Sequence, residues 1–157
     1  MAEYVSKTRT NYFAVEDAEA FAKLIGAAKA DDGGSLTVIH TGKNPDDDTV
    51  KYGFYCDGQL RGLPYSTETG QDTDPDDEDD DTDEYDLEKF YAELQKLVSP
   101  GDACIIMEAG AEAMRYVAGY AVVLTHDKRK FINLSNFAQS VAKQLLGNEN
   151  WTTKMEY

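Results

Sequence analysis

An acidic run in the middle of the chain constrains the fold more than any other feature. Between Asp72 and Glu88, 12 of 17 residues are Asp or Glu and none is Lys or Arg. Residues 71–84 contain no large apolar side chain, and their Asp residues repel one another and have low helix and strand propensity. Because such a stretch cannot be buried, we expect an exposed, low-complexity acidic loop over residues 71–84, with folded structure on either side.

The rest of the chain is close to electrically balanced. The net charge of the 157 residues is −15, but the 140 residues outside the run hold 18 acidic and 15 basic side chains. Apolar residues make up 41% of the chain, which is enough for a hydrophobic core and too rich for a wholly disordered protein. This length is typical of one domain, so we predict a single domain over residues 1–157 that contains the acidic loop.

Hydrophobic periodicity predicts three helices and eight strands. Glu16 and Asp17 suit the first turn of a helix and open an apolar stripe at helical spacing. Asp86 and Ser135 are suitable N-caps before two further stripes, and Gly147 follows the last of them, which predicts helices near 16–30, 86–98 and 135–146. Alternating or continuously apolar stretches predict strands near 4–15, 36–41, 50–56, 60–66, 103–107, 116–125, 129–133 and 151–157.

The resulting order, β-α-β-β-β-α-β-β-β-α-β, is dominated by hairpins. It predicts an α+β fold with a mainly antiparallel sheet and three helices on one face. Pro64 predicts that the strand near 60–66 lies at a sheet edge, and Gly119 predicts a bulge or a close approach inside its strand. The residues expected in the core are Phe21, Leu24, Phe54, Phe90, Leu94, Ile105, Val122, Phe137, Val141 and Leu145.

The acidic run also raises the question of a metal site. Asp72, Asp74 and Asp76 match the start of an EF-hand loop, but the glycine needed at the sixth position is Asp77 and the glutamate usual at the twelfth is Asp83. We therefore predict no dedicated metal site and no cofactor. A solvated acidic loop is the preferred interpretation, and loose cation binding by its carboxylates is the alternative.

Catalytic pairs receive little support from the sequence. If Leu36 faces Phe54 in the hairpin, His40 faces Val50, and Cys56 lies six residues along the strand, roughly 20 Å away. Cys104 lies in an apolar strand, where a thiol is usually an inert core group. Glu108 and Glu112 flank the predicted hairpin turn, and a solvated turn explains them better than glycosidase chemistry. We predict no catalytic residues and a protein that is not an enzyme.

Direct nucleic-acid binding and membrane insertion are both disfavoured. Phosphate contacts need clustered Lys and Arg, and the basic cluster Lys128-Arg129-Lys130 is only three residues long. No apolar run approaches the ~20 residues that span a bilayer, and the first ten residues lack the apolar stretch of a signal peptide. With two cysteines and no Cys-x-x-Cys pair, we expect a cytoplasmic protein with reduced thiols.

Several stretches together resemble a known group of proteins. They are Ser6–Phe13, Arg115–Tyr120, Asn133–Phe137 and Trp151–Tyr157. They resemble small acidic accessory proteins of conjugative elements and phages of gut Firmicutes, over nearly the whole chain except the acidic loop. The resemblance implies a mobile-element accessory protein of the class that includes inhibitors of host defence, such as anti-CRISPR and anti-restriction proteins, some of which mimic DNA. It carries no catalytic residue over to this chain.

Two function classes follow for this chain, with an enzyme of unrecognised type as a third. In the first, the protein inhibits a basic nucleic-acid-binding protein of the host, such as a CRISPR effector or a restriction enzyme, and its carboxylates occupy the basic groove in place of phosphates. In the second, it is a protein-binding or regulatory module that works through its sheet, and the acidic loop only adds solubility. The partner-binding residues predicted under the first hypothesis are Asp72, Asp74, Asp76, Asp77, Glu78, Asp79, Asp80, Asp81, Asp83 and Glu84 in the loop, with Asp46, Asp47 and Asp48 as a second patch.

Overall fold

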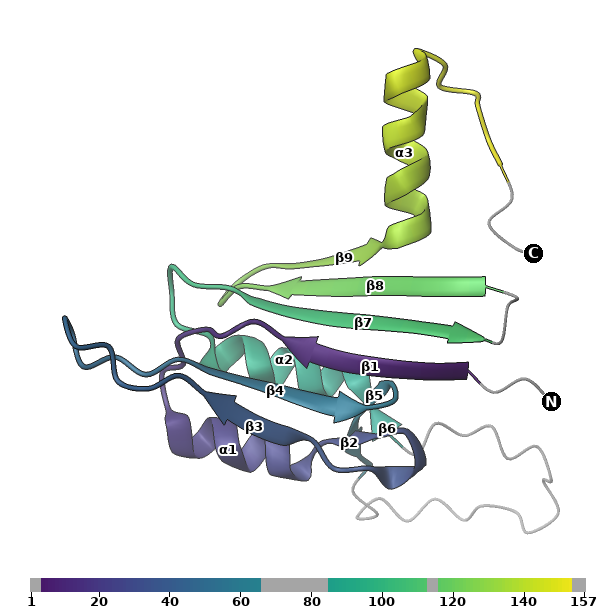
Figure 1. The fold of residues 1–157 in the computed structure, drawn as a ribbon. Helices are drawn as coiled ribbons and strands as arrows, with labels where there is room; N and C mark the ends of the chain where they lie inside the picture. Colours follow the sequence, from purple (N-terminus) through teal and green to yellow (C-terminus); the bar gives the residue numbers. More distant parts are fainter. Residues whose placement is uncertain (1–3, 66–84, 113–115, 154–157) are drawn as a thin grey trace, which may run out of the picture.

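A six-stranded antiparallel sheet forms the main layer of the protein (Figure 1). The computed structural model describes residues 4–65, 85–112 and 116–153. The strand order across the sheet is β3-β4-β1-β7-β8-β9, and every pair is antiparallel. The strands are β1 (Tyr4–Thr10), β3 (Thr37–His40), β4 (Tyr52–Asp57), β7 (Cys104–Glu112), β8 (Tyr116–Leu124) and β9 (Arg129–Asn133). The predicted α+β class is confirmed.

A second, smaller sheet lies beside the main one. Its three short strands are β2 (Lys29–Ala30), β5 (Leu60–Pro64) and β6 (Tyr85–Asp86), in the order β2-β5-β6. The prediction from Pro64 that this strand lies at an edge is wrong, because β5 is central and Pro64 pairs with Tyr85. The two-residue strands β2 and β6 are too short to give a periodic signal. A 3₁₀ turn over Asp31–Gly33 follows β2, so these residues do not end the preceding helix as expected.

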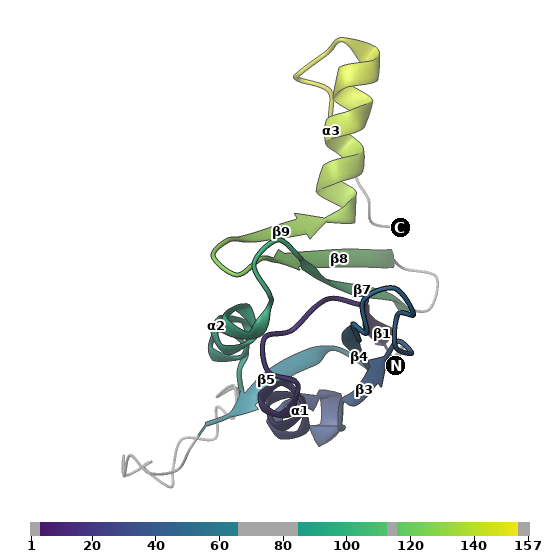
Figure 2. The same ribbon diagram turned by 90° about the vertical axis from the view of Figure 1, so that its left-hand side faces the viewer.

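Helices α1 (Ala18–Ala27) and α2 (Leu87–Leu97) pack on the same side of the main sheet (Figure 2). Each begins at an aspartate whose carboxylate accepts a hydrogen bond from a backbone N–H of the first turn, Asp17 from Ala20 and Asp86 from Lys89. We call the sheet face that they cover the core face and the opposite one the outer face. The largest fully buried side chains between helices and sheet are Phe13, Phe21, Phe54, Phe90, Ile25, Leu94, Leu124 and Val98.

Helix α3 (Leu134–Leu146) does not join this core. It follows β9 without a linker and extends beyond the β9 edge, away from the other strands, in both views (Figures 1 and 2). Its N-cap is Asn133 rather than the predicted Ser135, because the Asn133 amide oxygen accepts from the Asn136 N–H at 3.1 Å. Gly147 ends it in the left-handed conformation, as expected.

The predicted core is confirmed in the body except at one residue, and it is wrong in α3. Phe21, Phe54, Phe90, Leu94 and Val122 are buried, and Leu24 is partly buried against them. The prediction for Ile105 is wrong, because this partly buried residue points away from the core face on which its neighbours Cys104 and Ile106 are buried. The side chains Phe137, Val141 and Leu145 are 60%, 36% and 84% exposed, because in the described residues only the start of α3 lies against β8 and β9. The expectation that all three helices cover one face therefore holds for α1 and α2 only.

The structure corrects two further expectations and confirms a third. The β3–β4 register is shifted by two residues, since Val38 faces Phe54 and His40 faces Tyr52. Of the strand expected at the C-terminus, residues 151–153 are not in a strand, and the remaining residues lie outside the described part of the chain. The close approach predicted at Gly119 is confirmed, because a Cβ atom there would lie 2.9 Å from the Leu134 side chain.

Candidate functional site

The acidic segment between Tyr65 and Tyr85 is attached to the body at one narrow point. Its predicted binding residues, Asp72 to Glu84, lie outside the described part of the chain. The residues on either side of it are paired across the small sheet, Pro64 with Tyr85 and Leu63 with Asp86. We call these two pairs the clasp.

Close backbone packing next to the clasp reinforces this attachment. A Cβ atom at Gly62, where φ is +108°, would lie 2.6 Å from both the Asp86 carbonyl oxygen and the Leu87 Cα. Only glycine fits there, so β5 lies directly against the chain that leads from β6 into α2. Both ends of the acidic segment are therefore held at a fixed place on the body.

The second predicted patch, Asp46–Asp48, forms an exposed turn between β3 and β4. Asp47 organises this turn, because its Oδ1 accepts from the Thr49 Oγ1 at 2.7 Å and from the Thr49 N–H at 3.1 Å. Those two hydrogen bonds, the side-chain one above all, lower the pKa of the Asp47 carboxyl. Asp48 adopts φ of +57°, which aspartate tolerates better than most residues. Asp46 and Asp48 are thus the carboxylates of this patch that remain open to a partner.

The fold does not bring the two acidic regions together. In Figure 1 the turn that carries Asp46–Asp48 lies at one end of the main sheet, and the clasp formed by β5 and β6 lies at the other. The patch and the base of the segment therefore do not form one continuous acidic surface on the described body.

The cysteines and histidines do not assemble into a nucleophilic site. Cys56 and Cys104 are both buried, and burial is the main reason why the pKa of each thiol is raised. In the observed register His40 pairs with Tyr52, four residues from Cys56, or roughly 13 Å along the strand. The separation differs from the one expected, but it is still beyond hydrogen-bond reach.

Glu108 and Glu112 lie within β7 instead of flanking a turn. Four residues along one strand separate them by roughly 13 Å, more than the roughly 5–9.5 Å of paired glycosidase carboxylates. The Glu108 Oε1 accepts from the Tyr4 hydroxyl at 3.2 Å and from the Gln59 side-chain amide at 3.0 Å. Glu108 of β7 therefore connects to β1 and to the turn between β4 and β5.

A hollow of about 310 Å³ opens beside Glu108 on the core face, where α2 ends its cover of the sheet. Aromatic rings dominate its wall, and Arg129 stacks over two of them, 5.5 Å from the Tyr91 ring centroid and 5.6 Å from that of Phe131. Burial is the main reason why the pKa of Tyr91 is raised to about 12, so its hydroxyl stays neutral. The wall is mainly apolar, and its one carboxylate, Glu108, already accepts two hydrogen bonds, so this hollow is better suited to packing than to acid–base chemistry.

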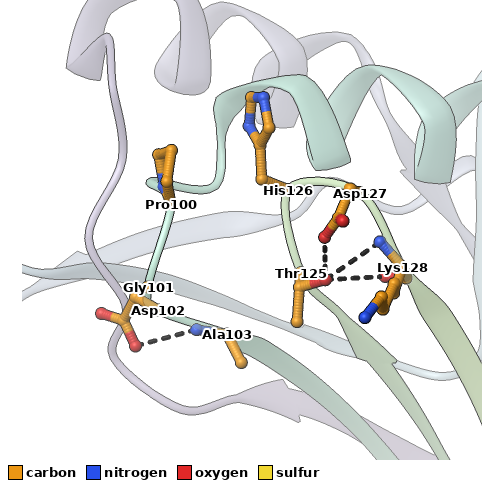
Figure 3. Close-up of a pocket in the computed structure, with 8 residues that line it drawn as sticks. All are labelled: Pro100, Gly101, Asp102, Ala103, Thr125, His126, Asp127 and Lys128. Carbon is orange, nitrogen blue, oxygen red and sulfur yellow. Dashed lines mark hydrogen bonds between the residues drawn. The ribbon is translucent and has the colours of Figure 1, made fainter.

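A wider hollow of about 700 Å³ lies between the loop before β7 and the β8–β9 turn (Figure 3). Asp102, on one side, accepts from the Ala14 and Ala103 N–H groups at 2.9 and 2.8 Å and lies 3.2 Å from the Lys51 ammonium. The His126 ring, on the other side, turns away from Asp102 and places its Nδ1 3.1 Å from the Val98 carbonyl oxygen. Both groups have structural partners, so this hollow holds no Asp–His pair.

The outer face of β7 and β8 is an apolar surface that sequence reasoning missed. On β7 and β8 every residue of the outer face is apolar: Ile105, Met107, Ala109, Ala111, Val117, Gly119, Ala121 and Val123. Neither α1 nor α2 covers this face, and Met107 and Val117 are 52% and 71% exposed. The signal was present in the sequence, because continuously apolar strands are typical of sheets covered on both sides.

The described ranges hold neither a cluster of metal ligands nor a membrane-spanning helix. Residues 4–65, 85–112 and 116–153 contain no group of three or more His, Cys, Asp or Glu side chains placed to hold a metal ion. No helix in the same ranges has the length and apolar character needed to cross a bilayer.

Comparison with known proteins gives no match: no protein-family model, no curated protein and no solved structure is significantly similar to this chain.

Proposed function

We propose that this protein is a non-enzymatic inhibitor that binds a basic nucleic-acid-binding protein of its host through the acidic segment. One observation carries the proposal. Residues 66–84 hold 11 acidic side chains and no basic one, so they account for 11 of the 15 excess negative charges of the chain. The clasp attaches both ends of this charge to a single place on a nearly neutral body.

Concentrated carboxylates compete with phosphates for the same cationic groups. A groove that binds nucleic acid is lined with Lys and Arg, and an anionic segment that enters it gains the same Coulomb attraction. A rigid mimic of duplex DNA would instead need carboxylates along a folded surface, whereas Asp46–Asp48 and the clasp lie at opposite ends of the body (Figure 1). The distribution therefore favours occupation of a groove by one segment, as an anti-CRISPR or anti-restriction type of inhibitor would require.

Charge neutralisation tests the proposal. Wild-type protein, a variant with Asp76, Asp77, Asp79, Asp80 and Asp81 replaced by Asn, and a variant lacking residues 71–84 are used as baits in a bacterial lysate. A partner that the wild type captures is then purified and titrated with all three proteins at ~50 and ~200 mM salt. We expect its affinity for the wild type to fall steeply with salt, and DNA or RNA to compete, because screened rim charges lose most of their attraction.

The matched control removes five exposed acids elsewhere: Glu16→Gln, Glu19→Gln, Asp32→Asn, Asp57→Asn and Glu149→Gln. This variant has the same net charge as the neutralised one and should still bind. Equal loss in both variants would mean that only total charge matters. Unchanged binding by the neutralised variant, with a flat salt response, would contradict the proposal.

That last outcome favours the second candidate function, a protein-binding module that works through its folded body. The observation in its favour is the uncovered apolar outer face of β7 and β8, with Met107 and Val117 more than half exposed. In that case the acidic segment contributes solubility alone.

A further inference from the structure

Two apolar surfaces have no helix packed on them within the described residues, although Leu134 lies over one position of the first, Gly119. The first is the outer face of β7 and β8, which has eight apolar positions in a row and no polar side chain. Small residues occupy its middle (Ala109, Ala111, Gly119 and Ala121), and larger ones stand around them. We call these eight positions the trough, because their small residues let a helix approach the sheet closely.

The second surface is the apolar stripe of α3. Phe137, Val141 and Leu145 recur at helical spacing and are all exposed, together with Leu134 and Leu146. The helix has a capped end on each side, with Asn133 accepting from the Asn136 N–H and the Gly147 N–H donating to the Gln144 carbonyl. Its only charged residue, Lys143, lies on the side away from the stripe.

The junction with β9 keeps α3 from covering its own trough. Asn133 is both the last residue of β9 and the N-cap of α3, so no linker residue is available to reverse the chain. Leu134 packs on Gly119 of β8, which fixes the start of the helix at the sheet. From there α3 extends past the β9 edge, away from β8 and β7 (Figure 1). Folding back would break the cap and the first turn.

We propose that the occupant of the trough is α3 of a second copy of this chain, in a reciprocal dimer. The thirteen residues of α3 make a helix about 20 Å long at ~1.5 Å per residue. The trough is as long, because the residue steps from Ile105 to Ala111 span roughly 20 Å at ~3.4 Å per residue. With a width of ~10 Å the flat footprint of the helix is roughly 200 Å². Side chains such as Phe137 and Leu145, which are 60% and 84% exposed, project from this outline. We therefore take the accessible area lost on each surface as roughly 400 Å².

This area is sufficient for a stable dimer only if the contact is made twice, once in each direction. In a twofold dimer each chain contributes both its stripe and its trough, so each loses roughly 800 Å² and the pair about 1,600 Å², the size of a stable specific interface. One helix docked on an unrelated partner would bury half as much. A charge-free apolar centre is also what such interfaces have. The second copy is thus the occupant that uses both open surfaces together.

The mass in solution of the wild type and of two doubly substituted variants tests the dimer. By sedimentation velocity the wild type should have twice the 17.4 kDa mass of the chain. Phe137→Glu with Leu145→Glu should raise the dimer dissociation constant at least ~100-fold, because two charges would enter an apolar contact. Both side chains are exposed in the single chain, so circular dichroism should show an intact fold. Asn136→Glu with Gln139→Glu adds the same charge to the opposite side of α3 and should leave the dimer unchanged.

Cross-linking between differently tagged chains tests the geometry. One chain carries Ala138→Cys in α3 and the other Ala109→Cys in the trough, and both native cysteines are buried. A short bismaleimide should join the two different chains. A monomer at ~100 µM, a dimer that the Phe137/Leu145 variant does not weaken, or a link that forms only within one doubly substituted chain would each overturn the proposal. The variant with five neutralised loop aspartates should dimerise normally, which separates this inference from the proposed function.

Discussion

Helices α2 and α3 carry the same kind of amphipathic pattern and end in opposite environments. In α2 the stripe that includes Phe90 and Leu94 is completely buried against the sheet. In α3 the stripe that includes Phe137 and Leu145 is mostly exposed. Composition does not explain the contrast, since both helices are capped and both have large apolar residues at helical spacing.

The connections explain it instead. Helix α2 also begins without a linker, since Asp86 is both the last residue of β6 and the N-cap of α2, but its other end is connected to the main sheet by the six residues that lead into β7. Helix α3 is connected to the sheet only where it leaves β9, and no strand follows it in the described residues. Periodicity therefore predicts that a helix has an apolar partner, whereas the strands at its two ends decide whether that partner can belong to the same chain.

The largest expected effect comes from truncating one phenylalanine in each helix. Phe90→Ala should lower the free energy of unfolding by about 3–5 kcal/mol, because it leaves a cavity in the core. At concentrations where the chain is monomeric, Phe137→Ala should change it by less than ~0.5 kcal/mol, as is usual for exposed positions. Urea unfolding followed by circular dichroism measures both.

Repeating the two measurements at several protein concentrations tests the comparison further. If α3 packs on a second copy, the effect of Phe137→Ala should grow as concentration rises, because the folded dimer is stabilised by mass action. The Phe90→Ala effect should not grow in this way. Equal losses in the two variants at every concentration would mean that α3 packs on its own body, contrary to its exposed stripe.

A smaller effect on the free energy of unfolding is expected at Asp102. Burial alone would raise the pKa of Asp102, but hydrogen bonds from the Ala14 and Ala103 N–H groups and the nearby Lys51 outweigh it, and the net pKa lies below the ordinary value of 3.8. A lowered pKa in the folded state adds stability that is present above 3.8 and is lost as pH falls through the folded value.

Asp102→Asn should therefore cost about 1 kcal/mol near pH 7 and progressively less below the ordinary carboxyl range. Urea midpoints of wild type and variant, measured from pH 7 down to the acid limit of the fold, give the difference. Asp32→Asn, which removes an exposed charge, is the matched control. A difference that stays constant down to the acid limit would contradict a role for the charged carboxylate.

The smallest effect is expected on the solvent side of α2. Lys96 and Glu93 form an ion pair at 2.9 Å with the Lys96 side chain 68% exposed. Exposed pairs of this type are worth little, so Lys96→Ala should change the free energy of unfolding by less than ~0.5 kcal/mol. A loss comparable to that of Phe90→Ala would show that the two sides of α2 are not as different as their burial indicates.

Much of the fold could be predicted from the sequence because its signals are local. The cap at Asp86, the stop at Gly147 and the alternation of β4 depend on neighbouring residues, and the structure has them where they were expected. The β3–β4 register was missed by two residues, since it depends on how a long connection closes. The exposure of Phe137 was missed because it depends on tertiary packing, which no local pattern encodes.

The candidate site could be predicted less well. The charge that supports the proposed function is visible in composition alone, and its main part lies outside the described residues. The trough on β7 and β8 was hidden because an apolar strand such as Ala103–Met107 reads as buried on both faces. Only the arrangement of the helices shows that neither α1 nor α2 covers Met107, which is 52% exposed.

The clasp between Pro64 and Tyr85 has a consequence for how this protein can change over evolutionary time. Two paired residues fix the distance across which the intervening chain must close, and doubling the length of a flexible connection costs only ~0.6 kcal/mol. Residues can therefore be gained or lost between Tyr65 and Tyr85 with little effect on the rest of the fold. The clasp makes this position an insertion point, at which length and charge can vary while the core sequence stays constant.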